Sequence, residues 1–96
     1  MLGHILVVPK SQVDELFDLD QAAYNELWVF TRLIASALKK TISCNRIGVS
    51  VIGFEVPHAH IHLIPINNMS DMNFANKISI SDSELKNISQ KIANNI

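Results

Sequence analysis

The sequence predicts an α+β domain, in which an antiparallel sheet carries one long amphipathic helix and the chain closes with a second helix. Three patterns indicate this class. Apolar runs of strand length end at Pro9 and again at Pro65, an apolar stripe with helical spacing runs from Ala23 to Leu38, and a capping box begins at Ser81. Strands joined by a short connection pair antiparallel, and an amphipathic helix then buries its apolar stripe against one face of the sheet.

The length limits the number of domains, and the net charge limits the kinds of partner. Ninety-six residues predict a single domain, 1–96, because one core usually occupies about 100–150 residues. The hydrophobic content of 48% is that of a folded protein. The formal net charge of −1 provides no electrostatic footprint for nucleic acid or for an anionic membrane, so we expect neither as a partner.

The cysteine count and the first residues bear on the compartment. Cys44 is the single cysteine, which excludes an internal disulfide and fits a reducing environment. The segment Met1–His4 lacks the basic and apolar regions of a signal peptide, and no apolar run approaches the length of a membrane span. We therefore expect a cytoplasmic protein.

The first half of the chain predicts a strand, a short loop and a long helix. His4–Pro9 is apolar and β-branched, which at this length favours a buried strand. One or two helical turns are expected within 11–19. Asp18 is the expected N-cap of a helix that runs to about Thr41. Its apolar stripe has spacings of three and four and consists of Ala23, Leu27, Phe30, Ile34 and Leu38.

The second half predicts two strands and a second helix. Arg46–Val51 alternates apolar with small or polar residues, and a third strand is expected over His58–Ile66. These two strands are close enough in sequence to pair antiparallel. After a polar loop, Ser81 and Glu84 have the spacing of a capping box, which predicts a helix over about Asp82–Asn95.

Three histidines alternate with apolar residues in the third predicted strand. Positions i and i+2 of a strand share a face, so His58, His60 and His62 would project together at spacings of roughly 6–7 Å. If these positions only faced solvent, Thr, Lys or Ser would suit them as well as His. Because the chain has only four histidines, three on one face indicate a functional site.

Two chemistries use imidazoles in such a row. One is metal binding, but three residues spread over about 13 Å of strand converge poorly on one ion, so we expect no metal site. The other is nucleophilic and acid–base catalysis, with a central imidazole that attacks and flanking rings that assist. A phosphorus centre suits this arrangement because its negative oxygens are stabilised by imidazolium and backbone N–H groups.

Two blocks of the sequence resemble the histidine triad family of nucleotide-binding proteins: Gly3-His4-Ile5-Leu6-Val7-Val8-Pro9-Lys10 and His58-Ala59-His60-Ile61-His62-Leu63-Ile64-Pro65. The resemblance implies an α+β fold with an antiparallel sheet and a homodimer joined through the long helix and a strand. It also implies hydrolysis or transfer at the α-phosphate of purine nucleotides without a required cofactor, while zinc stays open as a ligand.

The resemblance also assigns roles to residues. His60 would be the nucleophile that forms a nucleotidyl-histidine intermediate, and His58 and His62 would bind and protonate around the phosphate. Four further residues are expected to bind the nucleotide: His4, Ser50, Glu55 and Val56.

Members of this family usually carry a further helix and strand pair before the Gly-His strand. The sequence therefore predicts a domain whose N-terminal strands are missing, either as a fragment or as a short form with an incomplete nucleoside pocket. The leading hypothesis is a hydrolase of nucleoside phosphoramidates, adenylylated compounds or dinucleoside polyphosphates. The alternative is a non-catalytic dimeric module that binds a nucleotide or zinc.

Overall fold

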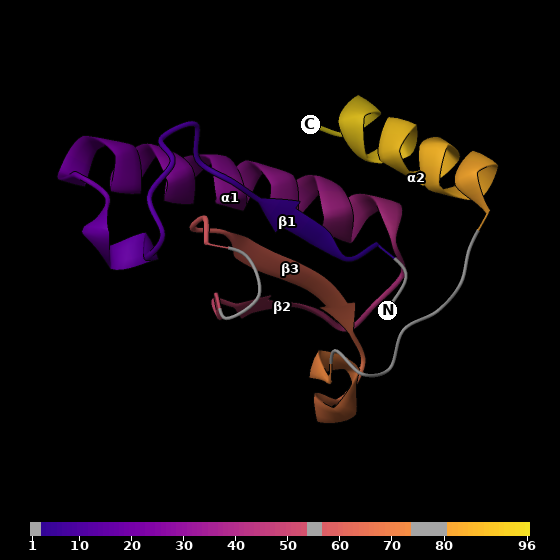
Figure 1. The fold of residues 1–96 in the computed structure, drawn as a ribbon. Helices are drawn as coiled ribbons and strands as arrows, with labels where there is room; N and C mark the ends of the chain where they lie inside the picture. The colour runs from indigo at the N-terminus through magenta and orange to yellow at the C-terminus, as the bar shows by residue number, and fades with distance from the viewer. Residues whose placement is uncertain (1–2, 54–56, 74–80) are drawn as a thin grey trace.

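The computed structural model describes residues 3–53, 57–73 and 81–96. Its elements, in chain order (Figure 1), are the strand β1 (Ile5–Val7), the 3-10 turn η1 (Leu16–Asp18), the helix α1 (Gln21–Thr41), the strands β2 (Arg46–Ser50) and β3 (Ile61–Ile66), the 3-10 turn η2 (Met69–Met72) and the helix α2 (Asp82–Asn94). This is the predicted α+β class, with both predicted helices present.

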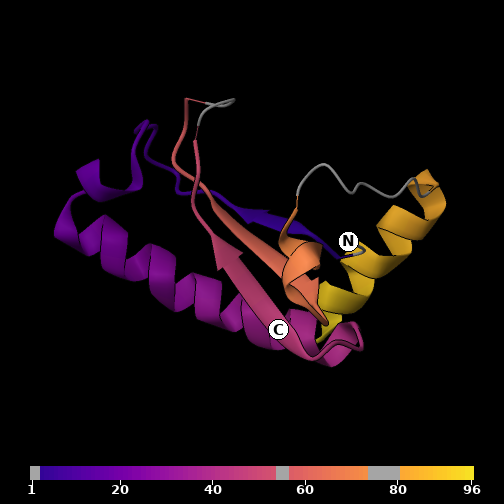
Figure 2. The ribbon, with the colours of Figure 1, turned by 90° about the horizontal axis from the view of Figure 1, so that it is seen from below.

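The sheet has the strand order β1-β3-β2, and both pairs are antiparallel. β3 is therefore the central strand, as Figure 1 shows. Ile61 and Leu63 of β3 are fully buried in the core, and their partners Val7 and Ile5 on β1 share that side of the sheet. The view from below shows α1 along one face of the sheet (Figure 2). His62 alternates with the core residues and therefore projects from the opposite face.

The structure corrects the start of the third strand. The sequence predicts a strand over His58–Ile66, but β3 begins at Ile61, where pairing with Val7 of β1 begins. Pro9 lacks a backbone N–H and cannot extend the ladder on the β1 side. Of the three triad histidines, only His62 therefore lies within a strand.

The long helix starts two residues later than predicted. Asp20, not Asp18, is the N-cap, and its Oδ1 accepts a hydrogen bond of 2.8 Å from the N–H of Ala23. Asp18 belongs to η1, and the N–H of Leu19 donates to the carbonyl of Leu16 to close that turn. The chain is thus still in a 3-10 turn where the sequence pattern places the helix start.

The buried face of α1 also differs from the predicted stripe at one position. Phe30 is 50% exposed, whereas Thr31 is buried. Thr31 tolerates burial because its hydroxyl donates to the carbonyl of Leu27 at 2.7 Å. The residues of α1 that do enter the core are Leu27, Thr31, Ile34, Ala37 and Leu38.

The second helix packs on α1 rather than directly on the sheet. Ser81 is its N-cap, as predicted, and the hydroxyl accepts from the N–H of Glu84 at 3.2 Å. Ile92 is buried, whereas Leu85 of the predicted stripe is exposed. The side chain of Asn95 donates to the hydroxyl of Thr41 at 3.0 Å, which fixes the end of α2 against the end of α1.

Candidate active site

His62 lies in the middle of the sheet face that points away from α1. Its register partners are Leu6 on β1 and Ser50 on β2. The Nδ1 atom of His62 and the Nε2 atom of His4 are 2.9 Å apart and share a hydrogen bond. The structure thus brings together three of the predicted site residues, His4, Ser50 and His62, from three different segments of the chain.

The imidazole of His60 is held in one tautomer. Its side chain is only 8% exposed, and its Nδ1 atom lies 2.7 Å from the carbonyl oxygen of His58. A carbonyl can only accept a hydrogen bond, so Nδ1 must carry the proton. In the neutral ring the lone pair is then on Nε2. The ring also packs edge to face against His62, with 4.8 Å between the ring centroids.

His58 has a different position from the one predicted. Its Nε2 atom donates to the carbonyl of Pro9 at 3.1 Å. This bond ties the segment before β3 to the residues that follow β1. The prediction that one strand carries all three imidazoles is wrong, because only His62 lies in β3, and the ring of His58 is bonded to the segment after β1. Its carbonyl oxygen accepts the hydrogen bond that orients His60.

Two of the clustered histidines resist protonation. Burial lowers the pKa of His4 below its usual value of 6.5. Burial also lowers the pKa of His62, and the neighbouring His4 and His60 add to this effect because two adjacent imidazolium ions repel each other. His4 and His62 are therefore predominantly neutral near pH 7.

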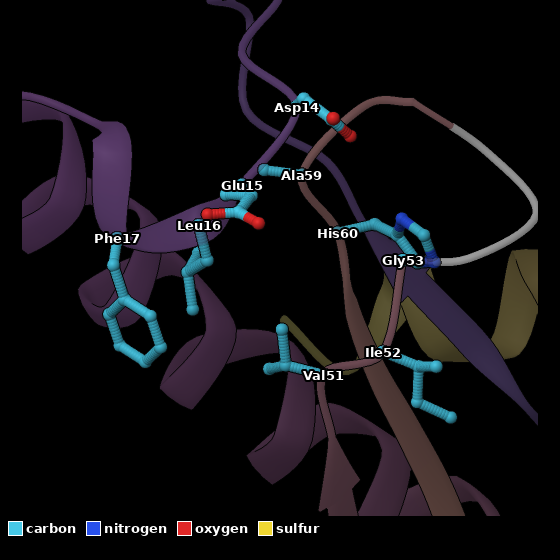
Figure 3. Close-up of a pocket in the computed structure, with 9 residues that line it drawn as sticks. All are labelled: Asp14, Glu15, Leu16, Phe17, Val51, Ile52, Gly53, Ala59 and His60. Atoms are coloured by element: carbon cyan, nitrogen blue, oxygen red, sulfur yellow. The ribbon is translucent and has the colours of Figure 1, made fainter.

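A cavity of about 330 Å³ opens beside His60 (Figure 3). Its walls come from the segment before and within η1, from the residues after β2 and from the segment before β3. The lining residues are Asp14, Glu15, Leu16, Phe17, Val51, Ile52, Gly53, Ala59 and His60. Of these, only His60 was predicted as a site residue.

The missed lining residues reach the site through a contact distant in sequence. The N–H of Ala59 donates to the carbonyl of Val13 at 2.6 Å, which brings the 14–17 segment beside His60. No local pattern in 11–19 indicates this contact. Gly53 has a φ of 109°, a conformation that glycine adopts easily, and this was the one available signal for a special turn at the cavity wall.

Two predicted nucleotide-binding residues, Glu55 and Val56, lie outside the described residues. In the ranges that the structure does describe, no three or more His, Cys, Asp or Glu side chains are grouped so that they could hold a metal ion. Within the same ranges, neither α1 nor α2 combines the length and hydropathy that a bilayer span requires.

Residues 1–69, which include both histidine blocks and the whole sheet, match the HIT domain family. The chain belongs to the histidine triad (HIT) family. A histidine triad protein of Bradyrhizobium japonicum has a similar fold, with a TM-score of 0.84 and 21% identity over 97% of this chain and 75% of that one. The predicted HIT-like fold class is thereby confirmed.

Two relatives illustrate the range of HIT proteins that this chain resembles. The bis(5'-nucleosyl)-tetraphosphatase (asymmetrical) of Schizosaccharomyces pombe is 31% identical over 66% of this chain. An uncharacterised HIT-like protein of Borreliella burgdorferi is 29% identical over 99% of the chain and 75% of its own length. The chain spans 37% of the length of the Schizosaccharomyces pombe enzyme.

Proposed function

We propose that this HIT protein hydrolyses or transfers nucleotidyl groups at the α-phosphate of purine nucleotides, with His60 as the nucleophile. The observation that carries the proposal is the bond from the Nδ1–H of His60 to the carbonyl of His58. It leaves Nε2 with a lone pair and fixes the plane of the ring. A nucleophile that is already oriented lowers the cost of reaching the transition state.

The proposed reaction has two displacements at phosphorus. First, the lone pair of His60 Nε2 forms an N–P bond while the bond from phosphorus to the leaving group breaks. The leaving group keeps that electron pair and takes up a proton. Water then attacks phosphorus and gives up a proton, and the N–P bond breaks with its electron pair returning to Nε2. Both steps spread negative charge over the phosphoryl oxygens.

The neighbouring groups have supporting roles in this proposal. His62, whose ring packs against that of His60, would donate a hydrogen bond to a phosphoryl oxygen or a proton to the leaving group. His4 would orient His62 through their shared hydrogen bond. Ser50, the register partner of His62, would contact the ribose or phosphate. Glu55 and the backbone N–H of Val56 are proposed phosphate-side contacts, from the resemblance alone.

A nucleotide substrate is supported by the relatives. The similar protein from Schizosaccharomyces pombe is named for the hydrolysis of a dinucleoside tetraphosphate. Among the substrates of this class, nucleoside phosphoramidates and adenylylated compounds react by the same two displacements. The reaction as written needs no cofactor. A free Cys44 fits a reducing environment, and we propose the cytoplasm as the compartment.

We also propose that the protein is a homodimer joined through α1 and β2. Four large apolar side chains on these two contacting elements, and a fifth directly after β2, are 40% or more exposed, which is unusual for a monomer surface. They are Val29, Phe30, Leu33, Val49 and Val51. β2 is an edge strand, so its outer backbone groups are also available to a second copy.

Replacement of His60 by Asn tests the enzymatic proposal against a binding module. Asn resembles imidazole in size and polarity but cannot form the N–P bond. We expect the release of AMP from adenosine 5'-phosphoramidate to fall by about 10³-fold or more, with the circular dichroism spectrum unchanged. Turnover that survives in a folded His60→Asn variant would contradict the assignment. Wild-type protein that binds AMP without turnover would favour the non-catalytic nucleotide-binding or zinc-binding alternative.

A further inference from the structure

The turn η2 covers part of the sheet face that presents His62, which we call the site face. η2 lies at the end of β3, on the side of the sheet away from α1 (Figures 1 and 2). Ile64 also projects from the site face, because it alternates with the core residue Leu63. Its side chain is nevertheless only 1% exposed, and η2 contacts β3. The site face therefore carries a small apolar cluster of its own, beside His62.

The contact between η2 and the sheet centres on Gly48, the register partner of Ile64 on β2. A Cβ atom added at Gly48 would lie 2.5 Å from the sulfur of Met72 and 3.3 Å from Cδ1 of Ile66. The thioether of Met72 thus occupies the space that any larger residue would need at this position. Glycine is required here by the close approach of a side chain, since the φ of Gly48 is not positive.

Hydrogen bonds hold η2 in this position. The N–H of Asn67, directly after β3, donates to Oδ2 of Asp71 at 2.8 Å. The N–H of Asn45, directly before β2, donates to Oδ1 of Asn67 at 2.8 Å. The turn is therefore tied to the end of β3 and to the start of β2, and the side chain of Met72 is held over Gly48.

The contact lies next to the candidate site along the same strand. Residues i and i+2 of a strand share a face at a spacing of roughly 6–7 Å, so Gly48 neighbours Ser50, the register partner of His62. Ser50 is the last residue of β2. The ends of strands open more easily than their middles unless other contacts hold them. The packing of Met72 on Gly48 supplies such a contact beside the pair of Ser50 and His62.

We propose that Met72 is a positioning residue for the reaction at His60. Its thioether, packed on Gly48, keeps the end of β2 against β3 and so holds Ser50 and His62 at a fixed separation. The inference rests on the proposed function, because it concerns two groups that would assist the nucleophile. Met72 acts through these groups and not by contact with the substrate. Its loss therefore lowers kcat more than it raises KM, since the orientation of assisting groups matters most in the transition state.

Steric complementation tests the proposal. Gly48→Ala adds a methyl group where the sulfur lies, and Met72→Ala removes the sulfur. For AMP release from adenosine 5'-phosphoramidate, we expect each single variant to lower kcat by about tenfold and to change KM by less than about twofold. In Gly48→Ala/Met72→Ala the added methyl group takes part of the vacated space, so kcat should return to within about threefold of the wild-type value. Activity is expressed per folded protein, as measured by circular dichroism.

A matched control and a second measurement separate positioning from stability. Met69 belongs to the same turn but is 83% exposed, so Met69→Ala should keep the wild-type kcat and KM. The imidazole ¹⁵N signals of His62, recorded by NMR without substrate, should move in each single variant and return in the double variant. If Gly48→Ala does not fold, Met72→Ala compared with Met69→Ala gives the same information.

Two results would overturn the inference. One is a folded Met72→Ala variant with the wild-type kcat and unmoved His62 signals. The other is a Gly48→Ala/Met72→Ala variant whose loss of kcat is the product of the two single losses, because the two positions would then act independently. Failure of the proposed function has a different signature, since the wild-type protein would not turn over the substrate while the His62 signals would still respond to Met72→Ala.

Discussion

The environment of each imidazole decides what that imidazole can do. His60 is bonded at Nδ1 and lines a cavity, while His4 and His62 use their facing nitrogens on each other. His58 is bonded to a backbone carbonyl beyond β1. The alternating pattern of the sequence predicts that these residues form a site. It cannot predict their separate roles, because the carbonyls and rings that distinguish them come from segments remote in sequence.

The lowered pKa values of His4 and His62 predict an effect of pH on stability. In the unfolded chain both groups titrate near 6.5, whereas burial makes the folded protein bind their protons less tightly. The stability they contribute is complete above about pH 6.5 and is lost as pH falls toward the lowered values, because the unfolded state takes up protons first. Urea unfolding should therefore give a smaller free energy at about pH 5.5 than at about pH 7.5.

A His4→Gln variant is the control for this effect. Glutamine keeps a hydrogen-bonding group toward His62 but does not titrate, and it also removes one source of repulsion. The difference in the free energy of unfolding between the two pH values should be smaller in this variant than in the wild type. An equal or larger difference would show that other groups cause the loss of stability.

At the scale of elements, local sequence signals define the helices well and the strands less well. The capping residue Ser81 and the apolar spacing of α1 are properties of short segments, and both predict real elements. The end of a strand depends on where its neighbour stops. β3 begins opposite Val7 because β1 ends there, which the pattern within His58–Ile66 does not reveal. The same reasoning explains Phe30, whose exposure depends on how α1 is placed over the sheet.

The structure places the N-cap of α1 at Asp20, whereas the sequence pattern predicts Asp18. Replacement of Asp20 by Ala removes the acceptor for the N–H of Ala23 and should lower the free energy of unfolding by about 1 kcal/mol. Replacement of Asp18 by Ala should change it by less than about 0.5 kcal/mol, because no helix-capping bond is lost. Chemical denaturation of both variants provides the measurement. A larger loss for Asp18→Ala would mean that the helix starts where the sequence pattern places it.

At the scale of the whole molecule, the two sides of the sheet have different functions. One side packs on α1 and forms the core, and the other presents His4, Ser50 and His62. Val51 connects the site to the proposed dimer surface, because it is exposed beside β2 and also lines the cavity next to His60. The sequence predicts the fold class and the triad through motifs, whereas the cavity arises only when Val13 meets Ala59 in the folded chain.

The proposed homodimer predicts how a charged substitution in the apolar surface of α1 and β2 changes the assembly. Leu33 on α1 is 47% exposed within the apolar surface, and Leu85 on α2 is 56% exposed outside it. Leu33→Asp would place an unpaired charge in the interface, so we expect the variant to sediment as a monomer at concentrations where the wild type is a dimer. Leu85→Asp should leave the dimer intact. A monomeric wild type, or equal effects of the two substitutions, would contradict the proposed interface.

The most direct test of the central claim is to trap the covalent intermediate. Wild-type protein mixed with adenosine 5'-phosphoramidate and quenched in alkaline denaturant, where phosphorus–nitrogen bonds to imidazole persist, is examined by intact mass and peptide fragmentation. If His60 is the nucleophile, one adenylyl group is expected on His60 and none in the His60→Asn variant. Release of AMP with the adenylyl group on another residue, or with no protein-bound adenylyl group at any quench time, would contradict it.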